Sequence, residues 1–239
     1  MRPAYYQIIL FSGTDRLSFL QGQMTQDLDA LHDAVSLPAA LCNAKGRVIV
    51  TCQLFALGDA TGMAVPSSMV AAVIKRLTMY KLRADVQMNS GDDECLAAAL
   101  KTAGLDTVDP FDLQQWQQIR VASGRADIVP ENSEQYTPHM LNLDLTGAIS
   151  FTKGCYTGQE VVARTEHLGK VKRRLNRYRL SNCRAMIGDK LSDGDRDVGK
   201  VVNVAGDEIL AVTPVDTHRL DLQLGTGTAA PLPLPYEIR

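Results

Sequence analysis

The stretch FTKGCYTGQEVVARTEHLG, residues 151–169, places a cysteine where its thiol could do chemistry. Cys155 follows Gly154, and Gly158 comes three positions later. Glycine carries no side chain, so a backbone that contains it can approach a ligand or a second chain closely. Two glycines around one cysteine are therefore typical of a thiol that must stay reachable.

Local electrostatics could also activate this thiol. Thr157 and Glu160 have the spacing of a capping box, which predicts a helix from about Thr157 to Gly169. The free N–H groups and dipole of its first turn, with the ammonium of Lys153, favour the thiolate form of Cys155.

The alternative for Cys155 is a small buried hydrophobic side chain, which is how most free cysteines are used. A relay with a histidine is not indicated. His167 lies about three helical turns further on, and His139 falls in an irregular segment.

Apolar periodicity outlines the elements that must position the cysteine. It predicts a strand over 5–12, a helix from Asp15 to about Leu28, a hairpin turn at 43–46, a helix that begins at Ser67 or Ser68, and a helix from Asp112 to Gly124. Residues 84–88 and 94–100 fit a strand or a helix equally well. After Gly169, short alternating runs separated by Asp-Gly and Gly-Asp turns indicate a small antiparallel β-barrel or sandwich. We expect an α+β body over residues 1–169 and a β-barrel over 170–239.

Composition places the chain among globular proteins, with 45% hydrophobic and 22% charged residues and a formal net charge of −2. No segment reaches the ~18–20 apolar residues of a membrane span, and the N-terminal residues turn polar too soon for a signal peptide. The five cysteines are widely spaced and contain no CxxC pair. We expect a cytoplasmic protein with no membrane association and no stably bound metal.

The cysteine stretch is similar to the signature K-G-C-[FY]-x-G-Q-E-x-x-A-R of the YgfZ family, whose relatives include the T-protein of the glycine cleavage system. The segments FLQGQMTQDL and ALCNAKGRVI resemble the family elements L-Q-G-Q-x-T-x-D and C-[DN]-A-K-G-[KR], in the same order. YTPHMLNLDLTGAISFTKG resembles the family's run into the cysteine motif. The resemblance covers most of the chain. It implies a T-protein-like folate-binding fold, with a ferredoxin-like α/β body and a C-terminal barrel.

This resemblance implies a folate-binding accessory protein that helps to assemble or repair iron–sulfur clusters in client enzymes, including radical enzymes that thiolate tRNA. Cys155 is then the functional thiol. The supporting motif positions are Lys153, Gly154, Tyr156, Gly158, Gln159, Glu160 and Arg164. Tetrahydrofolate or a derivative is the implied cofactor, and the positions that map to its contacts are Tyr6, Trp116, Gln21, Gln23, Asn43 and Lys45.

Two of these positions, Tyr6 and Trp116, are aromatic. Tyr6 stands where the family pattern has tryptophan, although a tyrosine ring still offers a flat face to a pterin. Trp116 has an alternative role in core packing, since Ile119 follows it at helical spacing.

The chain also departs from T-protein enzymes. They carry an acidic residue after the hairpin turn, and this chain has Val50 and Thr51 there. Acid/base assistance of that kind contributes ~10²–10⁴-fold, so we do not expect aminomethyltransferase activity, although it stays an alternative. The short spacing before the Trp116 helix indicates that the middle domain is truncated, roughly over 50–110, which leaves the folate channel partly open.

A basic stripe follows the cysteine. Residues 153–179 hold eight Lys or Arg against two acids. Lys170, Lys172, Arg173 and Arg174 could attract a polyanion such as the glutamate tail of folate, an acidic client surface or tRNA, or could form an ordinary solvated face. Because the stripe lacks interleaved aromatic residues, a tRNA-binding module is the weakest of the three functional hypotheses, after the folate-binding accessory protein and the aminomethyltransferase.

Overall fold

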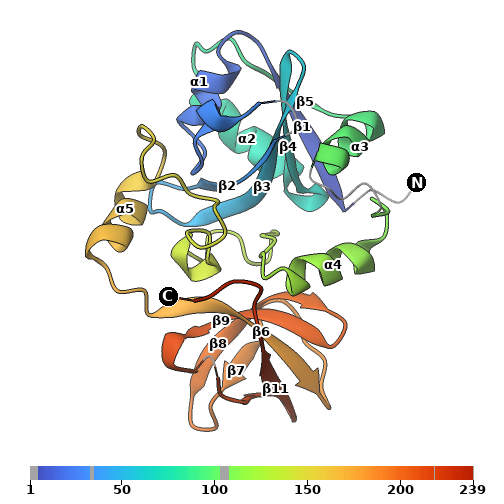
Figure 1. Cartoon of the computed structure of the whole chain (residues 1–239), viewed down its shortest axis with the longest axis vertical. Helices are drawn as coiled ribbons and strands as arrows, with labels where there is room; N and C mark the ends of the chain where they lie inside the picture. The colour runs from blue at the N-terminus through green and yellow to red at the C-terminus, as the bar shows by residue number, and fades with distance from the viewer. Residues whose placement is uncertain (1–4, 33–34, 103–107, 218, 239) are drawn as a thin grey trace.

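The computed structural model describes residues 5–32, 35–102, 108–217 and 219–238. An antiparallel sheet flanked by helices forms the N-terminal body, and a closed barrel follows it (Figure 1). This arrangement confirms the predicted mixed helix and strand body with a C-terminal antiparallel barrel. Each helix in the described part of the chain is too short or too polar to cross a lipid bilayer.

The sheet of the body has five strands in the order β2-β3-β4-β1-β5. Their bounds are Tyr6–Ser12 (β1), Ser36–Cys42 (β2), Val48–Leu57 (β3), Ala60–Pro66 (β4) and Gln87–Ser90 (β5). The predicted first strand is confirmed. So is the hairpin, because Asn43 and Gly46 form the turn between β2 and β3 through a Gly46 N–H bond to the Asn43 carbonyl of 2.9 Å.

Successive side chains of β1 point to opposite faces of the sheet, as strand geometry requires, and each face has its own hydrophobic core. Ile9 and Phe11 pack with α1 (Arg16–Gln21) and α2 (Val70–Lys81). Tyr6 and Ile8 point to the other face, which α3 (Asp93–Thr102) and α4 (Leu113–Ala122) cover. The sheet is thus buried on both faces, and Trp116 of α4 packs on the face that carries Tyr6.

Four predictions about helices have different outcomes. The helix predicted from Asp15 to Leu28 ends at Gln21, and a turn leads to the 3₁₀ helix η1 (Leu28–Ala30). A second 3₁₀ helix, η2 (Ser67–Met69), precedes α2, and no serine side chain caps α2. Residues 87–90 form a strand, and 93–102 a helix. The Asp112 cap of α4 is confirmed, because its carboxylate accepts from the Gln115 N–H at 2.9 Å.

The barrel closes in the order β10-β11-β6-β9-β8-β7. Its strands are Arg173–Ser181 (β6), Lys190–Ser192 (β7), Asp197–Ala205 (β8), Glu208–Pro214 (β9), Leu222–Leu224 (β10) and Gly227–Leu232 (β11), with a 3₁₀ turn at Val215–Thr217 (η4). Tyr178, Leu191 and Ile209 fill its interior.

A continuous core joins the barrel to the body. Leu175, Val202 and Leu210 of the barrel pack in one cluster with Ala40 and Ile128 of the body. Two further elements lie beside this junction, η3 (His139–Leu141) and α5 (Gln159–Leu168). Because α5 directly follows the cysteine, the junction helps to set where the thiol lies.

Candidate functional site

Cys155 is exposed at the surface, on a loop that leads into α5. Gly154 and Cys155 are exposed between two buried side chains, since Lys153 is 8% and Tyr156 is 7% exposed. A side chain at Gly154 would meet nothing within 4 Å, so this glycine leaves open space beside the thiol. The alternative of a buried structural cysteine does not describe Cys155. It does describe Cys42 and Cys52, whose pKa values burial raises to about 12.

The predicted capping box is wrong. Helix α5 begins at Gln159, and its N-cap is Gly158 with φ 85°, without a side-chain cap. A Cβ at Gly158 would lie 2.4 Å from the carbonyl oxygen of Asn43. Both the left-handed backbone and this close approach require glycine. The start of the helix is therefore set by contact with the β2–β3 hairpin, and its end at Gly169 is as predicted.

Lys153 anchors the cysteine loop to the turn after α1. Its Nζ donates to the carbonyl oxygens of Gln21 at 2.7 Å, and of Met24 and Gln26 at 2.8 Å each. The ammonium also lies 5.3 Å from the centre of the Tyr156 ring. Burial lowers the pKa of Lys153 to about 8. The charge expected to assist the thiolate is thus engaged in holding the loop.

Three sequence motifs meet at this loop. The Thr157 N–H donates to the Gly22 carbonyl at 3.2 Å, which adds to the Lys153 contacts with the glutamine-rich turn. The hairpin touches the start of α5, because a Cβ at Gly46 would lie 2.8 Å from Cβ of Val161. The segments FLQGQMTQDL, CNAKGR and KGCYTGQE therefore form one unit that presents Cys155.

The far end of α5 is also held. The Nε2 atom of His139 lies 3.0 Å from a carboxylate oxygen of Glu166. The ring of Phe151 lies 6.2 Å from that of His139 and 6.4 Å from that of His167. Phe151 begins the cysteine stretch, so both ends of the stretch are fixed to the helix and to η3.

A separate cavity of about 120 Å³ lies between the sheet and helices α3 and α4. Trp116, 2% exposed, lines it together with Tyr6, and the two rings meet edge to face at 5.2 Å. The indole N–H of Trp116 donates to the Asp109 carbonyl at 3.1 Å, which fixes the ring. The core packing that was the alternative for Trp116 is observed, and Trp116 also lines the cavity, while its contact with folate stays a prediction.

A buried carboxylate forms part of the cavity wall. Asp127 is 1% exposed. It accepts hydrogen bonds from the hydroxyls of Tyr6 at 2.6 Å and Tyr5 at 3.1 Å, and pairs with Nε of Arg120 at 2.9 Å. Although burial opposes its charge, Arg120 has a raised pKa because Asp127 lies beside it. Burial raises the pKa of Tyr6.

Sequence reasoning missed Asp127, Arg120 and Arg125, which all line the cavity. Asp127 and Arg125 lie in a segment without periodicity, and the sole sequence signal was an Arg and an Asp next to an apolar run. Val50 and Thr51 stand where T-protein enzymes place an acid. Val50 is buried in the core on the other face of the sheet. Thr51 lines the cavity, and its hydroxyl donates to the Ala126 carbonyl at 2.9 Å.

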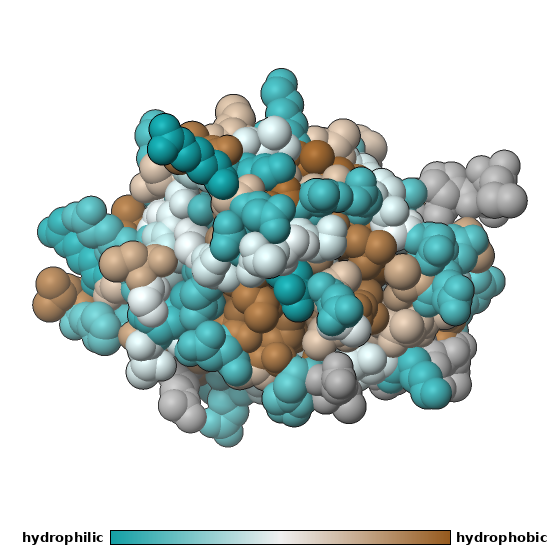
Figure 2. All heavy atoms as spheres, turned by 90° about the horizontal axis from the view of Figure 1, so that it is seen from above, coloured by the Kyte–Doolittle hydropathy of each residue, from teal (hydrophilic) through white to brown (hydrophobic). Residues whose placement is uncertain are grey.

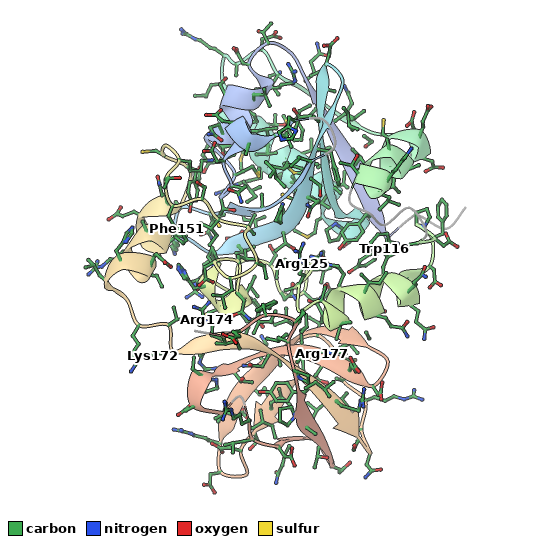
Figure 3. All side chains as sticks on the ribbon, in the orientation of Figure 1. Trp116, Arg125, Phe151, Lys172, Arg174 and Arg177 are labelled. Atoms are coloured by element: carbon green, nitrogen blue, oxygen red, sulfur yellow. The ribbon has the colours of Figure 1, made fainter. Side chains whose placement is uncertain are left out.

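The residues mapped to folate contacts fall into two groups. Tyr6 and Trp116 line the cavity. Gln21, Gln23, Asn43 and Lys45 belong to the turn and hairpin around the cysteine loop; Gln23, for example, contacts the Thr157 hydroxyl at 3.4 Å. In Figure 3, Trp116 and Phe151 lie on opposite sides of the body, which separates the cavity from the cysteine stretch.

The basic stripe is neutralised in part within the fold. Arg174 is 5% exposed and pairs with Asp144 at 2.6 Å, so its assignment to an exposed patch is wrong. Arg177 and Arg179 both pair with Glu208. Lys170, Lys172 and Arg173 remain exposed, and Figure 3 shows Lys172 at the edge of the molecule and Arg174 between body and barrel. The motif residues Glu160 and Arg164 are also exposed, on α5.

Comparisons with known proteins agree with this picture at two levels. The fold is that of the glycine cleavage T-protein: the Bartonella henselae aminomethyltransferase T structure has a TM-score of 0.67, with 13% identity, over 96% of this chain and 83% of that one. No family model matches the sequence.

The sequence itself is similar to curated proteins named tRNA-modifying protein YgfZ. The Yersinia pestis Pestoides F protein is 27% identical over 308 aligned residues, which cover 98% of this chain and 91% of the relative. The Hamiltonella defensa protein is 25% identical, covering 92% and 78%. The predicted resemblance to the YgfZ family is therefore confirmed. The first alignment is longer than the 239 residues of this chain, so that relative contains residues without a counterpart here. A truncated middle domain over 50–110 stays a prediction, as do the domain bounds.

Proposed function

We propose that this protein acts in tRNA modification as a folate-binding accessory factor for client enzymes that carry iron–sulfur clusters. The observation that carries the proposal is the presentation of Cys155: one exposed thiol on a loop fixed by three separate motifs. A cysteine that served only packing would not need such a scaffold. A thiolate is the form of cysteine that binds metals and attacks sulfur species.

For Cys155 we propose the role of a transient holder. It binds a cluster or a sulfur species on the way to the client, or exchanges with a client disulfide. Lys153 contributes by holding the loop, since its ammonium is bound by three carbonyl groups. The cluster is cargo in this scheme and belongs to the client.

The cavity beside Trp116 is the proposed folate site. Its aromatic wall suits a flat pterin, and Asp127 can accept from a ring N–H. A carboxylate has about four acceptor positions, and Tyr5, Tyr6 and Arg120 address three of them, which leaves one for a ligand. A space of about 120 Å³ suits the ring alone, so the glutamate tail would extend outside it.

An aminomethyltransferase is the weaker alternative. Thr51 stands in the cavity wall where such enzymes would place an acid, and its hydroxyl is already bonded to the Ala126 carbonyl. Asp127 is the carboxylate of the cavity, and it carries an arginine partner. Product formation from an aminomethylated carrier and tetrahydrofolate would identify this activity directly.

A fluorescence titration tests the folate site, because Trp116 is the only tryptophan of the chain. Tetrahydrofolate is added under reducing, anaerobic conditions, with free tryptophan as the correction for absorbance. We expect saturable quenching that Thr51→Val weakens and Lys45→Gln leaves unchanged, since Lys45 lies at the cysteine loop. Absence of quenching together with absence of binding heat would refute the site. Equal weakening by Lys45→Gln would move the ligand to the cysteine loop.

A further inference from the structure

Cations of the body gather along α2, just after it and at the start of α1, where Lys75 and Arg83 are exposed and Arg16, Arg76 and Lys81 are half-buried. Lys75, Arg76, Lys81 and Arg83 fall within nine consecutive residues, and Arg16 at the start of α1 lies in the same corner. The backbone connects them, because the Asp15 N–H donates to the Asp85 carbonyl at 3.2 Å. Within the described part of the chain, none of these five cations forms a salt bridge, in contrast to Arg174, Arg177 and Arg179 of the barrel.

Apolar and aromatic side chains lie among these cations. Leu82 is 89% exposed, Met79 57% and Tyr80 38%. Leu82 ends the helix with φ 46°. The guanidinium of Arg76 lies 5.1 Å from the centre of the Tyr80 ring. Figure 2 views the end of the molecule where α1 and β5 lie in Figure 1, and shows hydrophobic atoms interspersed among hydrophilic ones.

We propose that this α2 surface (Arg16, Lys75, Arg76, Met79, Tyr80, Lys81, Leu82 and Arg83) binds RNA. The cations would contact phosphates, and the free face of Tyr80 would stack on a base. Lysine and arginine beside an exposed aromatic ring are the combination that binds single-stranded and looped RNA. The barrel stripe lacks such a ring.

Two carboxylates in the same corner favour RNA over a uniformly anionic lipid surface. Asp85 accepts from the N–H and the hydroxyl of Thr14, both at 3.0 Å, and Asp15 accepts from the Asp85 N–H at 2.8 Å. These bonds hold the turn, and the backbone N–H of Thr14 lowers the pKa of Asp85. The phosphates of an anionic membrane surface would be repelled by both carboxylates. RNA instead offers base amino groups and 2′-hydroxyls, which donate to carboxylates.

The position of the surface links it to the cysteine loop. Arg16 begins α1, and Gln21, whose carbonyl accepts from Lys153, ends it. A helix of six residues is about 9 Å long. RNA bound at the α2 surface would therefore lie near the element that anchors the Cys155 loop. This inference goes beyond the proposed function, since a cluster-handling factor need not touch RNA.

The test measures binding of fluorescein-labelled bacterial tRNA by anisotropy at several salt concentrations. One variant combines Lys75→Gln, Lys81→Gln and Arg83→Gln. The matched control removes the same charge from the barrel side through Lys170→Gln, Lys172→Gln and Arg173→Gln. Three lost phosphate contacts reduce the slope of log K against log salt by about 2–3 and weaken binding about 100-fold near 0.1 M salt. The control variant should bind like the unmodified protein.

Tyr80→Ala separates RNA recognition from plain charge attraction. Loss of one stacked base should weaken tRNA binding about 10-fold, without changing the salt slope or the circular dichroism spectrum. The proposal is overturned if tRNA does not bind at low salt, if both triple variants lose binding equally, or if Tyr80→Ala has no effect. It is also overturned if vesicles of phosphatidylglycerol and phosphatidylcholine bind the α2 surface and tRNA does not.

The outcome is independent of the proposed function. Cys155→Ser should bind tRNA like the unmodified protein, and the α2 triple variant should keep its tetrahydrofolate quenching. A triple variant that loses tRNA binding and keeps tetrahydrofolate quenching therefore supports the RNA surface without bearing on the proposed function. A Cys155 variant that works normally in cells would contradict the proposed role of the cysteine without bearing on the RNA surface.

Discussion

Lys153→Met tests the anchoring of the cysteine loop, because methionine keeps most of the stem and removes the ammonium. Three bonds to carbonyl oxygens disappear. A hydrogen bond to a charged group contributes about 1.5–3 kcal/mol. Part of this sum is offset by the desolvation of the buried ammonium, which is several kcal/mol and lowers the pKa of Lys153 to about 8. We expect a net loss of about 2–4 kcal/mol in the free energy of unfolding.

Two measurements check this expectation. Chemical denaturation gives the free energy of unfolding, and amide hydrogen exchange reports whether residues 21–28 and 153–158 lose protection together. Lys45→Met is the matched control, since Lys45 is an exposed lysine on the neighbouring hairpin. If Lys153→Met were as stable as the control and exchange in residues 21–28 were unchanged, the account of Lys153 as the anchor would be wrong.

Three further predictions concern the same loop. Cys155 should react first with iodoacetamide in the native protein, while Cys42, whose pKa burial raises to about 12, should react only after unfolding; mass spectrometry of the modified peptides decides this. Gly158→Ala should destabilise the protein by more than 1 kcal/mol, a rough figure for a side chain forced to a positive φ, because its Cβ would lie 2.4 Å from a carbonyl oxygen, whereas Gly154→Ala should be neutral in the same denaturation assay. As pH rises from about 8 to about 10, the unfolded state keeps the Lys153 proton that the folded state releases, so the unmodified protein should gain stability relative to Lys153→Met; a difference that shrinks over this range would contradict the lowered pKa.

Features that rest on local chemistry could be predicted from the sequence. The Asp112 cap of α4 depends on a side chain and an N–H three residues apart. The hairpin at 43–46 needed only its turn residues and two apolar runs. A small antiparallel β module was predictable because alternation and turn signals repeat after Gly169, whereas its closure depends on which strands pair, including β10 with β7.

Features that rest on distant contacts could not be predicted. Thr157 and Glu160 have the spacing of a capping box, yet contact between Gly158 and the hairpin carbonyl of Asn43 decides where α5 begins. Asp127 is the clearest omission at the site, because its partner Tyr6 lies 121 residues away in the chain.

The charge pattern of β6 shows the same limit. Alternation along a strand indicates which side chains share a face, but it does not identify what that face meets. Arg174 meets Asp144 from the loop before the cysteine, with only 5% of the arginine exposed. Lys170, Lys172 and Arg173 stay exposed just before Arg174, so the fold divides a run of cations that looks uniform in the sequence.

The central claim is that the Cys155 thiol carries the function. The most direct measurement is the level of thiolated tRNA, together with the activity of a cluster-dependent client enzyme, in cells that lack this protein and receive a variant of it. We expect Cys155→Ser to fail to restore either level and Cys183→Ser, on the barrel, to restore both, with equal amounts of each protein in the cells. Full restoration by Cys155→Ser would contradict the claim.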